Sequence, residues 1–244
     1  KSIGVPIDKL EFVKGTDYQL GPEYSLDVYK LAALTSFKDS KKAGAEVVKQ
    51  SDNPKMSSLL YPILQSLDEH YLEVDAQFGG VDQRKIFMFA REYLGKVGYS
   101  KRIHLMNPMI PGLTGDKMSS SEEASKIDLL DEAKTVVKKM NKAYCEEGVI
   151  EGNGVLAFLK NIIFPILDNK EESFVIKRDE KYGGDLTFED YGKVECDFKE
   201  KKLHPADLKS GVAAELNKIL EPLRKAYEAD EKIQFTTSLA YPKK

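Results

Sequence analysis

Short apolar stretches that fit β-strands alternate with longer helical patterns through the first half of the chain. This alternation constrains the fold strongly, because helices that connect neighbouring parallel strands are typical of βαβ units. We therefore predict an α/β fold with a parallel sheet. The expected strands cover residues 10–14, 73–78 and 102–106, and the expected helices cover 23–37, 38–49, 57–71 (capped by Ser57 or Ser58) and 82–94.

Helical patterns dominate the second half of the chain. The change of pattern near residues 125–130 predicts a domain boundary there. We expect an α/β domain over residues 1–126 and a mostly α-helical domain over residues 127–244. The helices expected in the second domain cover 131–144, 153–167, 188–201 and 205–227, with one short strand at 174–178.

Composition excludes several classes of protein. With 37 Lys and Arg against 40 Asp and Glu the net charge is −3, so any RNA contact must come from a local basic patch. Cys145 and Cys196 lie far apart and the three His occur singly, so neither a disulfide framework nor a metal cluster is expected. Free cysteines indicate a reducing compartment, the cytosol. The most apolar stretch, 154–167, is interrupted by polar residues and is shorter than the roughly 20 residues of a membrane span.

The segment PGLTGDKMSSS, at residues 111–121, is a glycine-flanked loop that ends in one cation and three hydroxyls. Such a loop can close over a polyphosphate, where the amine of Lys117 would neutralise charge and the serines would donate hydrogen bonds. Ser119–Ser121, followed by Glu122 and Glu123, also fits the capping of a following helix. Both interpretations are open on the residues alone.

The segment FGGVDQ, at residues 78–83, follows a predicted strand and precedes a predicted helix. A glycine pair at the end of a strand lets a ligand approach the bare backbone, and the start of the next helix favours anions. Asp82 could accept hydrogen bonds from ribose hydroxyls. The alternative is an ordinary tight turn in which Asp82 caps the helix.

Three polar side chains share one face of the predicted helix 57–71. Tyr61, Gln65 and Asp68 stand at i, i+4 and i+7 among leucines and an isoleucine, where unpaired polar groups would be costly. Together with Gln83 they could form a pocket for a small zwitterion such as an amino acid. The alternative is a solvated helix face.

These segments resemble the tyrosyl branch of the class I aminoacyl-tRNA synthetases, in its eukaryotic cytoplasmic form. KMSSS is similar to the KMSKS signature of that class, and VDAQFGGVDQRK is similar to its Gly-x-Asp-Gln segment. GTDYQL, KKAGAEVVKQ and GYSKRIHLMNPMIPGLTG are further similar strings in the same order. The resemblance implies the second half of a Rossmann-like catalytic domain, followed by an α-helical anticodon-binding domain.

The resemblance also implies an activity, tyrosine–tRNA ligase, and a role for each motif. Asp68 would contact the phenol of the substrate tyrosine, and Tyr61, Gln65 and Gln83 would surround its ammonium group. The catalytic residues would be Lys117, Ser119, Ser120 and Ser121, and the ATP-binding residues would be Gly80, Asp82, Lys117 and Met118.

By the same resemblance the partners are L-tyrosine, ATP with Mg²⁺, and tRNA(Tyr), with no structural metal and no membrane. A cytoplasmic homodimer formed through the catalytic domain is implied. In the helical domain, Tyr182 would stack on an anticodon base and Asp207 would accept a hydrogen bond from that base. For Asp207 the alternative is helix capping after Pro205.

Class I synthetases carry a HIGH-type motif near the first strand of the nucleotide fold, and none of the three His residues here lies in such a context. We therefore expect a fragment that lacks the first half of the catalytic domain and is inactive by itself. The alternative function is a non-catalytic tRNA-binding or regulatory fragment. A tryptophanyl enzyme is a third option, against which Asp68 argues, because an indole presents its donor at a different reach.

Overall fold

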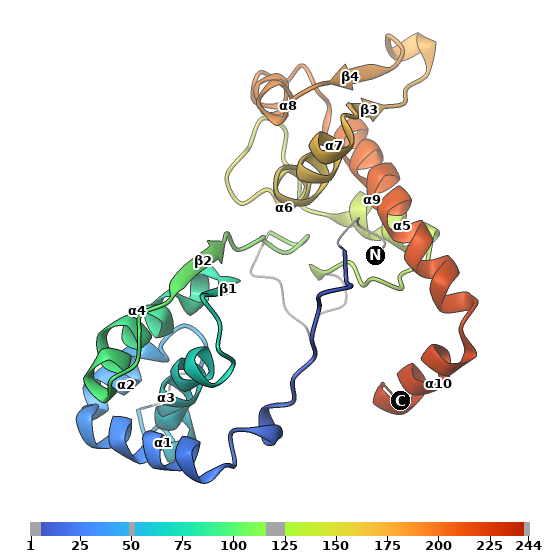
Figure 1. The fold of residues 1–244 in the computed structure, drawn as a ribbon. Helices are drawn as coiled ribbons and strands as arrows, with labels where there is room; N and C mark the ends of the chain where they lie inside the picture. The colour runs from blue at the N-terminus through green and yellow to red at the C-terminus, as the bar shows by residue number, and fades with distance from the viewer. Residues whose placement is uncertain (1–5, 49–51, 116–124, 242–244) are drawn as a thin grey trace. The chain divides into compact units, whose positions relative to one another are not determined.

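The computed structural model describes residues 6–48, 52–115 and 125–241 (Figure 1). The chain divides into two compact units. One consists of Leu10–Met109 and is called the α/β unit below. The other consists of Lys1–Lys9 with Ile110–Lys244 and is called the helical unit.

The α/β unit contains a parallel pair of strands, β1 (Ala76–Gly80) and β2 (Ile103–Asn107). Their register runs from Ala76 opposite Ile103 to Gly80 opposite Asn107. The predicted parallel pairing of these two segments is therefore confirmed. The strand predicted at 10–14 is wrong, because this segment pairs with no described strand and its side chains are exposed, Phe12 by 89%.

Three α-helices precede β1 in sequence and a fourth connects β1 to β2, and all four contribute to the core of the unit. Tyr24, Leu31, Ile63, Leu67 and Phe89 are almost fully buried in one cluster. The helices are α1 (Pro22–Leu34), α2 (Phe37–Ala43), α3 (Met56–Tyr71) and α4 (Arg84–Tyr93), with 3₁₀ turns at Gly15–Asp17, Val81–Gln83 and Leu94–Val97.

Two details of the predicted helices are wrong. The helix predicted at 38–49 ends at Ala43, where Gly44, a residue of low helix propensity, takes the C-cap position. Neither Ser57 nor Ser58 caps α3, since the N-cap position is Lys55 and its side chain makes no capping hydrogen bond.

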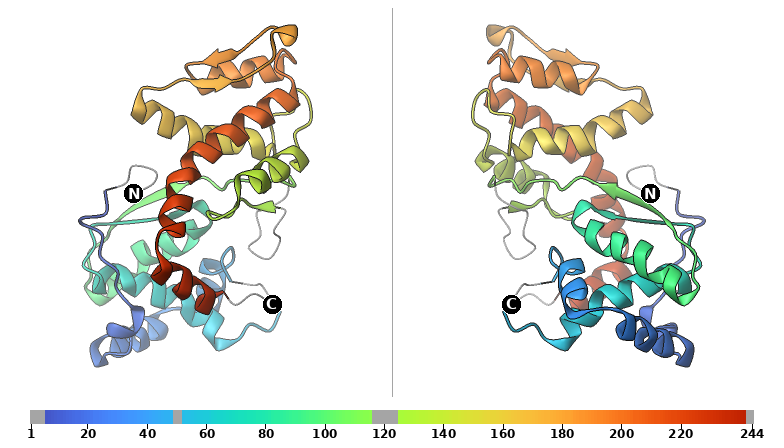
Figure 2. Two further views of the ribbon diagram at one scale, coloured as in Figure 1. Left: turned by 90° about the vertical axis from the view of Figure 1, so that its right-hand side faces the viewer. Right: turned by 90° about the vertical axis from the view of Figure 1, so that its left-hand side faces the viewer.

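The helical unit is built on the long helix α9 (Pro205–Glu228), against which α5 (Ala133–Lys142) packs (Figure 2). A short antiparallel hairpin, β3 (Phe174–Ile176) with β4 (Leu186–Phe188), lies beside α9. The sequence analysis missed β4 because it has only three residues. The remaining elements are α6 (Gly154–Phe158), a π-helical turn (Leu159–Ile163), α7 (Phe164–Lys170), a 3₁₀ turn (Glu180–Tyr182), α8 (Tyr191–Lys199) and α10 (Glu231–Ala240).

The helix α10 was also missed, because it buries none of its residues and so lacks a clear apolar periodicity. Its start does carry a signal, since the Asp230 side chain accepts a hydrogen bond from the backbone N–H of Ile233. Each described helix of the chain is too short or too polar to span a bilayer.

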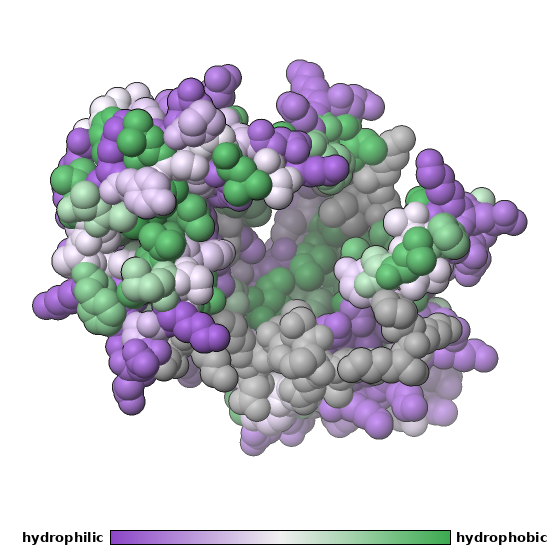
Figure 3. Space-filling model, turned by 90° about the horizontal axis from the view of Figure 1, so that it is seen from below, coloured by the Kyte–Doolittle hydropathy of each residue, from purple (hydrophilic) through white to green (hydrophobic). Residues whose placement is uncertain are grey.

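Hydrophobic residues are not confined to the two cores. Figure 3 shows them interspersed with hydrophilic residues over one face of the molecule. In the α/β unit, Phe78, Ile103 and Leu105 share the face of the strand pair that is opposite to His104, and 71%, 61% and 53% of their surfaces are exposed.

The compact units divide between Met109 and Ile110, whereas the change of sequence pattern predicts a boundary at 126/127. Leu113 shows the reason. It is fully buried in the core of the helical unit, and its carbonyl accepts a 2.7 Å hydrogen bond from the N–H of Tyr144. The first part of the glycine-flanked loop is thus anchored to the helical unit.

Gly154 should be essential for this anchoring. A Cβ atom there would lie 2.6 Å from the carbonyl oxygen of Gly112, and a backbone atom cannot rotate away. We expect Gly154→Ala to destabilise the helical unit by about 1–3 kcal/mol, the usual cost of overpacking. Differential scanning calorimetry would measure this loss. Gly95→Ala is the control, since its added Cβ meets no atom within 4 Å apart from the adjoining backbone, and an equal loss in both variants would contradict the argument.

Candidate active site

The carboxylate of Asp68, in the last turn of α3, lies among donors from two other segments of the α/β unit. Its Oδ1 accepts a 2.9 Å hydrogen bond from Nε2 of Gln19 and a 3.0 Å hydrogen bond from the hydroxyl of Tyr24. The Tyr24 hydroxyl also lies 2.8 Å from the carbonyl oxygen of Leu64, one turn earlier on α3. Sequence analysis found Asp68 but missed Gln19 and Tyr24.

The tyrosines beside Asp68 remain protonated at neutral pH. Burial, and then the negative charge of Asp68, raises the pKa of Tyr18 to about 12. The same causes, in the same order, raise the pKa of Tyr24. Both phenols are therefore donors, and a half-buried carboxylate that already receives phenol and amide donors is suited to a further hydroxyl group.

The amide side chains of the predicted pocket meet each other. Nε2 of Gln65, on α3, donates to Oε1 of Gln83 at 3.0 Å. Both residues are half-buried, so the alternative of a solvated helix face is wrong for Gln65, as it is for Asp68. Tyr61, one helical turn before Gln65, is 44% exposed, and here that alternative remains open. The structure thus brings Gln65 and Gln83 together, and their role in an amino-acid pocket stays a prediction.

Gly79 and Gly80 end β1, and space beside both is tight. A Cβ atom on Gly79 would lie 3.0 Å from Cζ of Phe87, and one on Gly80 would lie 2.5 Å from Oδ1 of Asp82. Asp82 therefore folds back over the backbone of Gly80. Gly80 is the N-cap of the 3₁₀ turn Val81–Gln83, and Gln83 is the N-cap of α4; neither makes a side-chain capping hydrogen bond. The alternative in which Asp82 caps the helix is therefore wrong.

The predicted catalytic residues of the glycine-flanked loop lie outside the described residues. Lys117, Met118, Ser119, Ser120 and Ser121 belong to this loop, and neither their predicted roles nor the alternative of helix capping is tested by the structure.

In the helical unit, Arg178 contacts Asp207 and the turn that carries Tyr182, the two residues predicted to contact the anticodon. Its Nη1 lies 3.3 Å from Oδ2 of Asp207, and its Nε donates to the carbonyl of Gly184 at 2.8 Å. Gly184 belongs to the tight turn that carries Tyr182, whose side chain is 66% exposed. Asp207 does not cap α9, because His204 occupies the N-cap position and its Nδ1 accepts from the N–H of Ala206.

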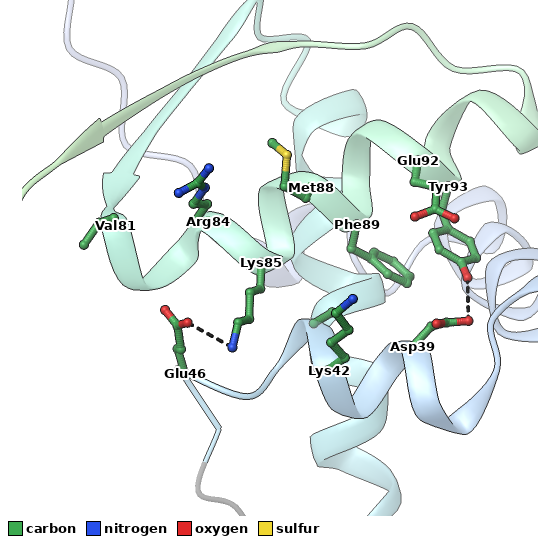
Figure 4. Close-up of a pocket in the computed structure, with 11 residues that line it drawn as sticks. Asp39, Lys42, Glu46, Val81, Arg84, Lys85, Met88, Phe89, Glu92 and Tyr93 are labelled. Atoms are coloured by element: carbon green, nitrogen blue, oxygen red, sulfur yellow. Dashed lines mark hydrogen bonds and ion pairs between the residues drawn. The ribbon is translucent and has the colours of Figure 1, made fainter.

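A cavity of about 530 Å³ lies between α2 and α4 of the α/β unit (Figure 4). Met88 and Phe89 contribute apolar surface, and charged side chains of both signs surround them. Of these, Lys85 pairs with Glu46 at 3.0 Å, as Figure 4 shows. The described lining shares no residue with the predicted tyrosine and nucleotide sites.

One group of potential metal ligands occurs among the described residues. Cys196, Asp197 and Glu200 on or just after α8 place one ligand atom each within 4.8 Å of the others. Lys193 lies 2.7 Å from Asp197 and Lys202 lies 2.5 Å from Glu200, so lysines already neutralise both carboxylates.

Known proteins of one family are similar to this chain. The family model for class I tRNA synthetases of the tryptophan and tyrosine type matches residues 1–221. The cytoplasmic tyrosine–tRNA ligase of Danio rerio is 60% identical over 99% of this chain, which spans 45% of that relative. The tyrosine–tRNA ligase of Haloarcula marismortui is 43% identical over all of this chain, which covers 70% of it.

A solved structure is similar too. The tyrosyl-tRNA synthetase of Archaeoglobus fulgidus, crystallised with L-tyrosine, is 41% identical, with a TM-score of 0.83 over 92% of this chain and 69% of its own. The chain therefore belongs to the class I tRNA synthetases of the tryptophan and tyrosine type. Within that class, these relatives carry the tyrosyl name, which confirms the resemblance drawn from the motifs and the predicted α/β fold class.

Proposed function

We propose that this chain provides part of a tyrosine–tRNA ligase, which activates tyrosine with ATP and transfers it to tRNA(Tyr). The observation that carries the proposal is the position of Asp68, whose carboxylate receives donors from Gln19 and Tyr24 at the end of the helix that also carries Gln65. A carboxylate held in this way is suited to the phenol of tyrosine. The tyrosine–tRNA ligases among the relatives support the same substrate.

In the first step, an oxygen of the tyrosine carboxylate bonds to the α-phosphorus of ATP, the bond to the bridging oxygen breaks, and pyrophosphate leaves. In the second step, the oxygen of a terminal ribose hydroxyl of tRNA bonds to the tyrosyl carbonyl carbon and its proton is released. The bond from that carbon to the phosphate oxygen breaks, and AMP leaves with the bonding electron pair. Neither step needs a protein nucleophile, so the protein contributes positioning and electrostatic stabilisation.

Each predicted site has one task in this scheme. Asp68 binds the phenol, and Tyr61, Gln65 and Gln83 bind the ammonium group. Gly80 and Asp82 receive the ribose of ATP. The Asp82 carboxylate, which lies beside Gly80, accepts hydrogen bonds from the ribose hydroxyls. Class I synthetases in general use ATP with Mg²⁺, and we propose that Mg²⁺ arrives with the nucleotide. The residues proposed for the phosphates are Lys117, Met118, Ser119, Ser120 and Ser121.

ATP–pyrophosphate exchange with each amino acid in turn, on the full-length gene product, tests the proposal. We expect exchange with tyrosine and none above background with phenylalanine or tryptophan. Exchange with tryptophan would show that the pocket has been assigned to the wrong substrate. If no amino acid supports exchange while tRNA still binds, the non-catalytic alternative is correct.

The remaining assignments concern organisation. Residues 1–126 would belong to the catalytic domain and 127–244 to the anticodon-binding domain. We also propose a homodimer formed through the catalytic domain, which light scattering of the gene product would detect. A cytoplasmic location is supported by the names of relatives such as the Danio rerio ligase.

Alanine substitution of Tyr182 or Asp207 should weaken aminoacylation of tRNA(Tyr) by about 1–3 kcal/mol each, the scale of base stacking or of a good base-edge contact. Tyrosine activation, measured by pyrophosphate exchange, should stay nearly unchanged. Phe235→Ala is a matched control, because Phe235 is a similarly exposed aromatic residue of the helical unit. A parallel loss of both reactions would indicate a structural role and contradict the anticodon assignment.

A further inference from the structure

Glu69 and His104 form a buried hydrogen-bonded pair that none of the proposed steps uses. Oε1 of Glu69 lies 2.8 Å from Nε2 of His104, and the exposed fractions of the two side chains are 1% and 3%. Glu69 directly follows Asp68 on α3, so one residue faces the predicted phenol site and the next faces the strand pair. Both members of the pair, and all their described contacts, lie within the α/β unit.

A chain of contacts runs from this pair to the glycines of the nucleotide segment. In the β1–β2 register His104 stands opposite Gln77, and Gln77 precedes Gly79 by two residues on β1. The ring of Phe87, on α4, stacks on the His104 imidazole with centroids 4.6 Å apart and planes 15° apart. Phe87 in turn limits the space at Gly79, where an added Cβ would lie 3.0 Å from its Cζ and 3.2 Å from Cγ of Gln83.

Burial of ionisable side chains costs free energy even when they are paired, and apolar residues of similar volume often stabilise a fold equally well. Burial raises the pKa of Glu69, and the hydrogen bond and charge of His104, with Arg102 on the loop before β2 and Arg91 on α4, oppose that rise. A hydrogen-bonded pair, however, fixes both distance and direction between two elements, whereas apolar surfaces allow small shifts. The pair is thus better explained by positioning than by stability.

We propose that the Glu69–His104 pair is a positioning device, which holds the helix carrying Gln65 and Asp68 in register with the glycines that end β1. The proposal rests on the proposed function, because the two elements would carry tyrosine and ATP. The pair then sets how the tyrosine carboxylate meets the α-phosphate, while the contacts that bind each substrate separately stay in place. Glu69 and His104 touch neither substrate.

The test is tyrosine activation by the full-length gene product, with active sites counted by single-turnover formation of tyrosyl-adenylate. Glu69→Leu and His104→Leu should each lower kcat per active site by about tenfold to a hundredfold, the cost of misplacing reacting groups by an ångström. The KM values for tyrosine and ATP should change by less than about threefold, since each substrate keeps its own contacts. Glu69→Gln, which keeps a hydrogen bond to His104, should restore kcat to within about twofold.

A single apolar substitution leaves one buried polar side chain without its partner and could prevent folding, so the double variant Glu69→Met with His104→Leu is decisive. It should fold, because neither polar partner remains, and it should be as slow as either single variant. Glu215→Leu is the matched control: Glu215 is a buried acid of the helical unit, paired with Lys218 at 2.6 Å, and its loss should lower stability without changing kcat per active site.

The outcomes separate the two proposals. A wild-type protein without tyrosine-dependent exchange would overturn the proposed function, and the positioning role with it. An active wild type, together with a folded double variant of unchanged kcat, would overturn the positioning role alone. A lower count of active sites with unchanged kcat per site would show that the pair serves folding only, and it too would overturn the inference.

Discussion

Replacing Asp68 by alanine in the full-length gene product should raise the KM for tyrosine and reduce discrimination against phenylalanine by roughly tenfold to a hundredfold. The carboxylate is half-buried and receives donors from Gln19 and Tyr24, so these groups are oriented around one point at the end of α3. A hydrogen bond to a charged group is worth about 1.5–3 kcal/mol, and phenylalanine, which lacks the hydroxyl, cannot form it. Exchange kinetics with both amino acids measure the ratio.

Asp27 provides a matched control for this prediction. It is also a buried carboxylate of the α/β unit, and it accepts hydrogen bonds from the hydroxyls of Tyr71 and Tyr99. Asp27→Ala should therefore lower thermal stability while the ratio of tyrosine to phenylalanine activation stays the same. If Asp68→Ala leaves that ratio unchanged, the assignment of Asp68 to the phenol is wrong.

The parts of the fold that the sequence predicted well are those with a strong period and a local signal. The apolar residues of α3 recur at helical spacing, and the segments of β1 and β2 are short apolar stretches that alternate with helices. Elements whose stability depends on distant residues were placed less well. The segment 10–14 has the composition of a strand, but a strand also needs a partner, and no described strand pairs with it.

The candidate site shows the same division between local and distant information. Tyr61, Gln65 and Asp68 could be grouped because helical geometry alone places them on one face. Tyr18, Gln19 and Tyr24 could not, because they reach Asp68 only through tertiary packing across more than 40 residues of sequence. The string GTDYQL, which contains Tyr18 and Gln19, was part of the resemblance, and its polar aromatic and amide groups outside any predicted helix were the available signal.

Helix capping is the third feature for which the sequence alone left two interpretations. For Asp82 and Asp207, capping and ligand binding both fitted the sequence, since an acid near a helix start serves either purpose. The structure assigns the cap positions to other residues, His204 in the case of α9. The Asp82 carboxylate lies beside Gly80, at the place that a Cβ of residue 80 would need, and the Asp207 carboxylate pairs with Arg178.

Lys117→Ala should give the largest kinetic effect of any single substitution considered. In the proposed reaction negative charge grows on the bridging oxygen as pyrophosphate departs, and a cation placed there is worth more in the transition state than in the bound ATP. Loss of one such group typically costs about 10²–10³ in rate. We therefore expect the rate constant for tyrosyl-adenylate formation to fall by roughly that factor, while the Kd for ATP rises by less than about tenfold.

Single-turnover experiments at varied ATP concentration separate these two constants. Lys126→Ala is a suitable control, because Lys126 is a cation just beyond the same loop and is paired with Asp128 at 3.3 Å. It should change neither constant by more than about twofold, since exposed ion pairs contribute little. Equal losses in rate and in ATP affinity for Lys117→Ala would mean that the amine binds ATP and the transition state equally well. In that case the loop would serve nucleotide capture, and catalysis would have to depend on the positioning of the two substrates.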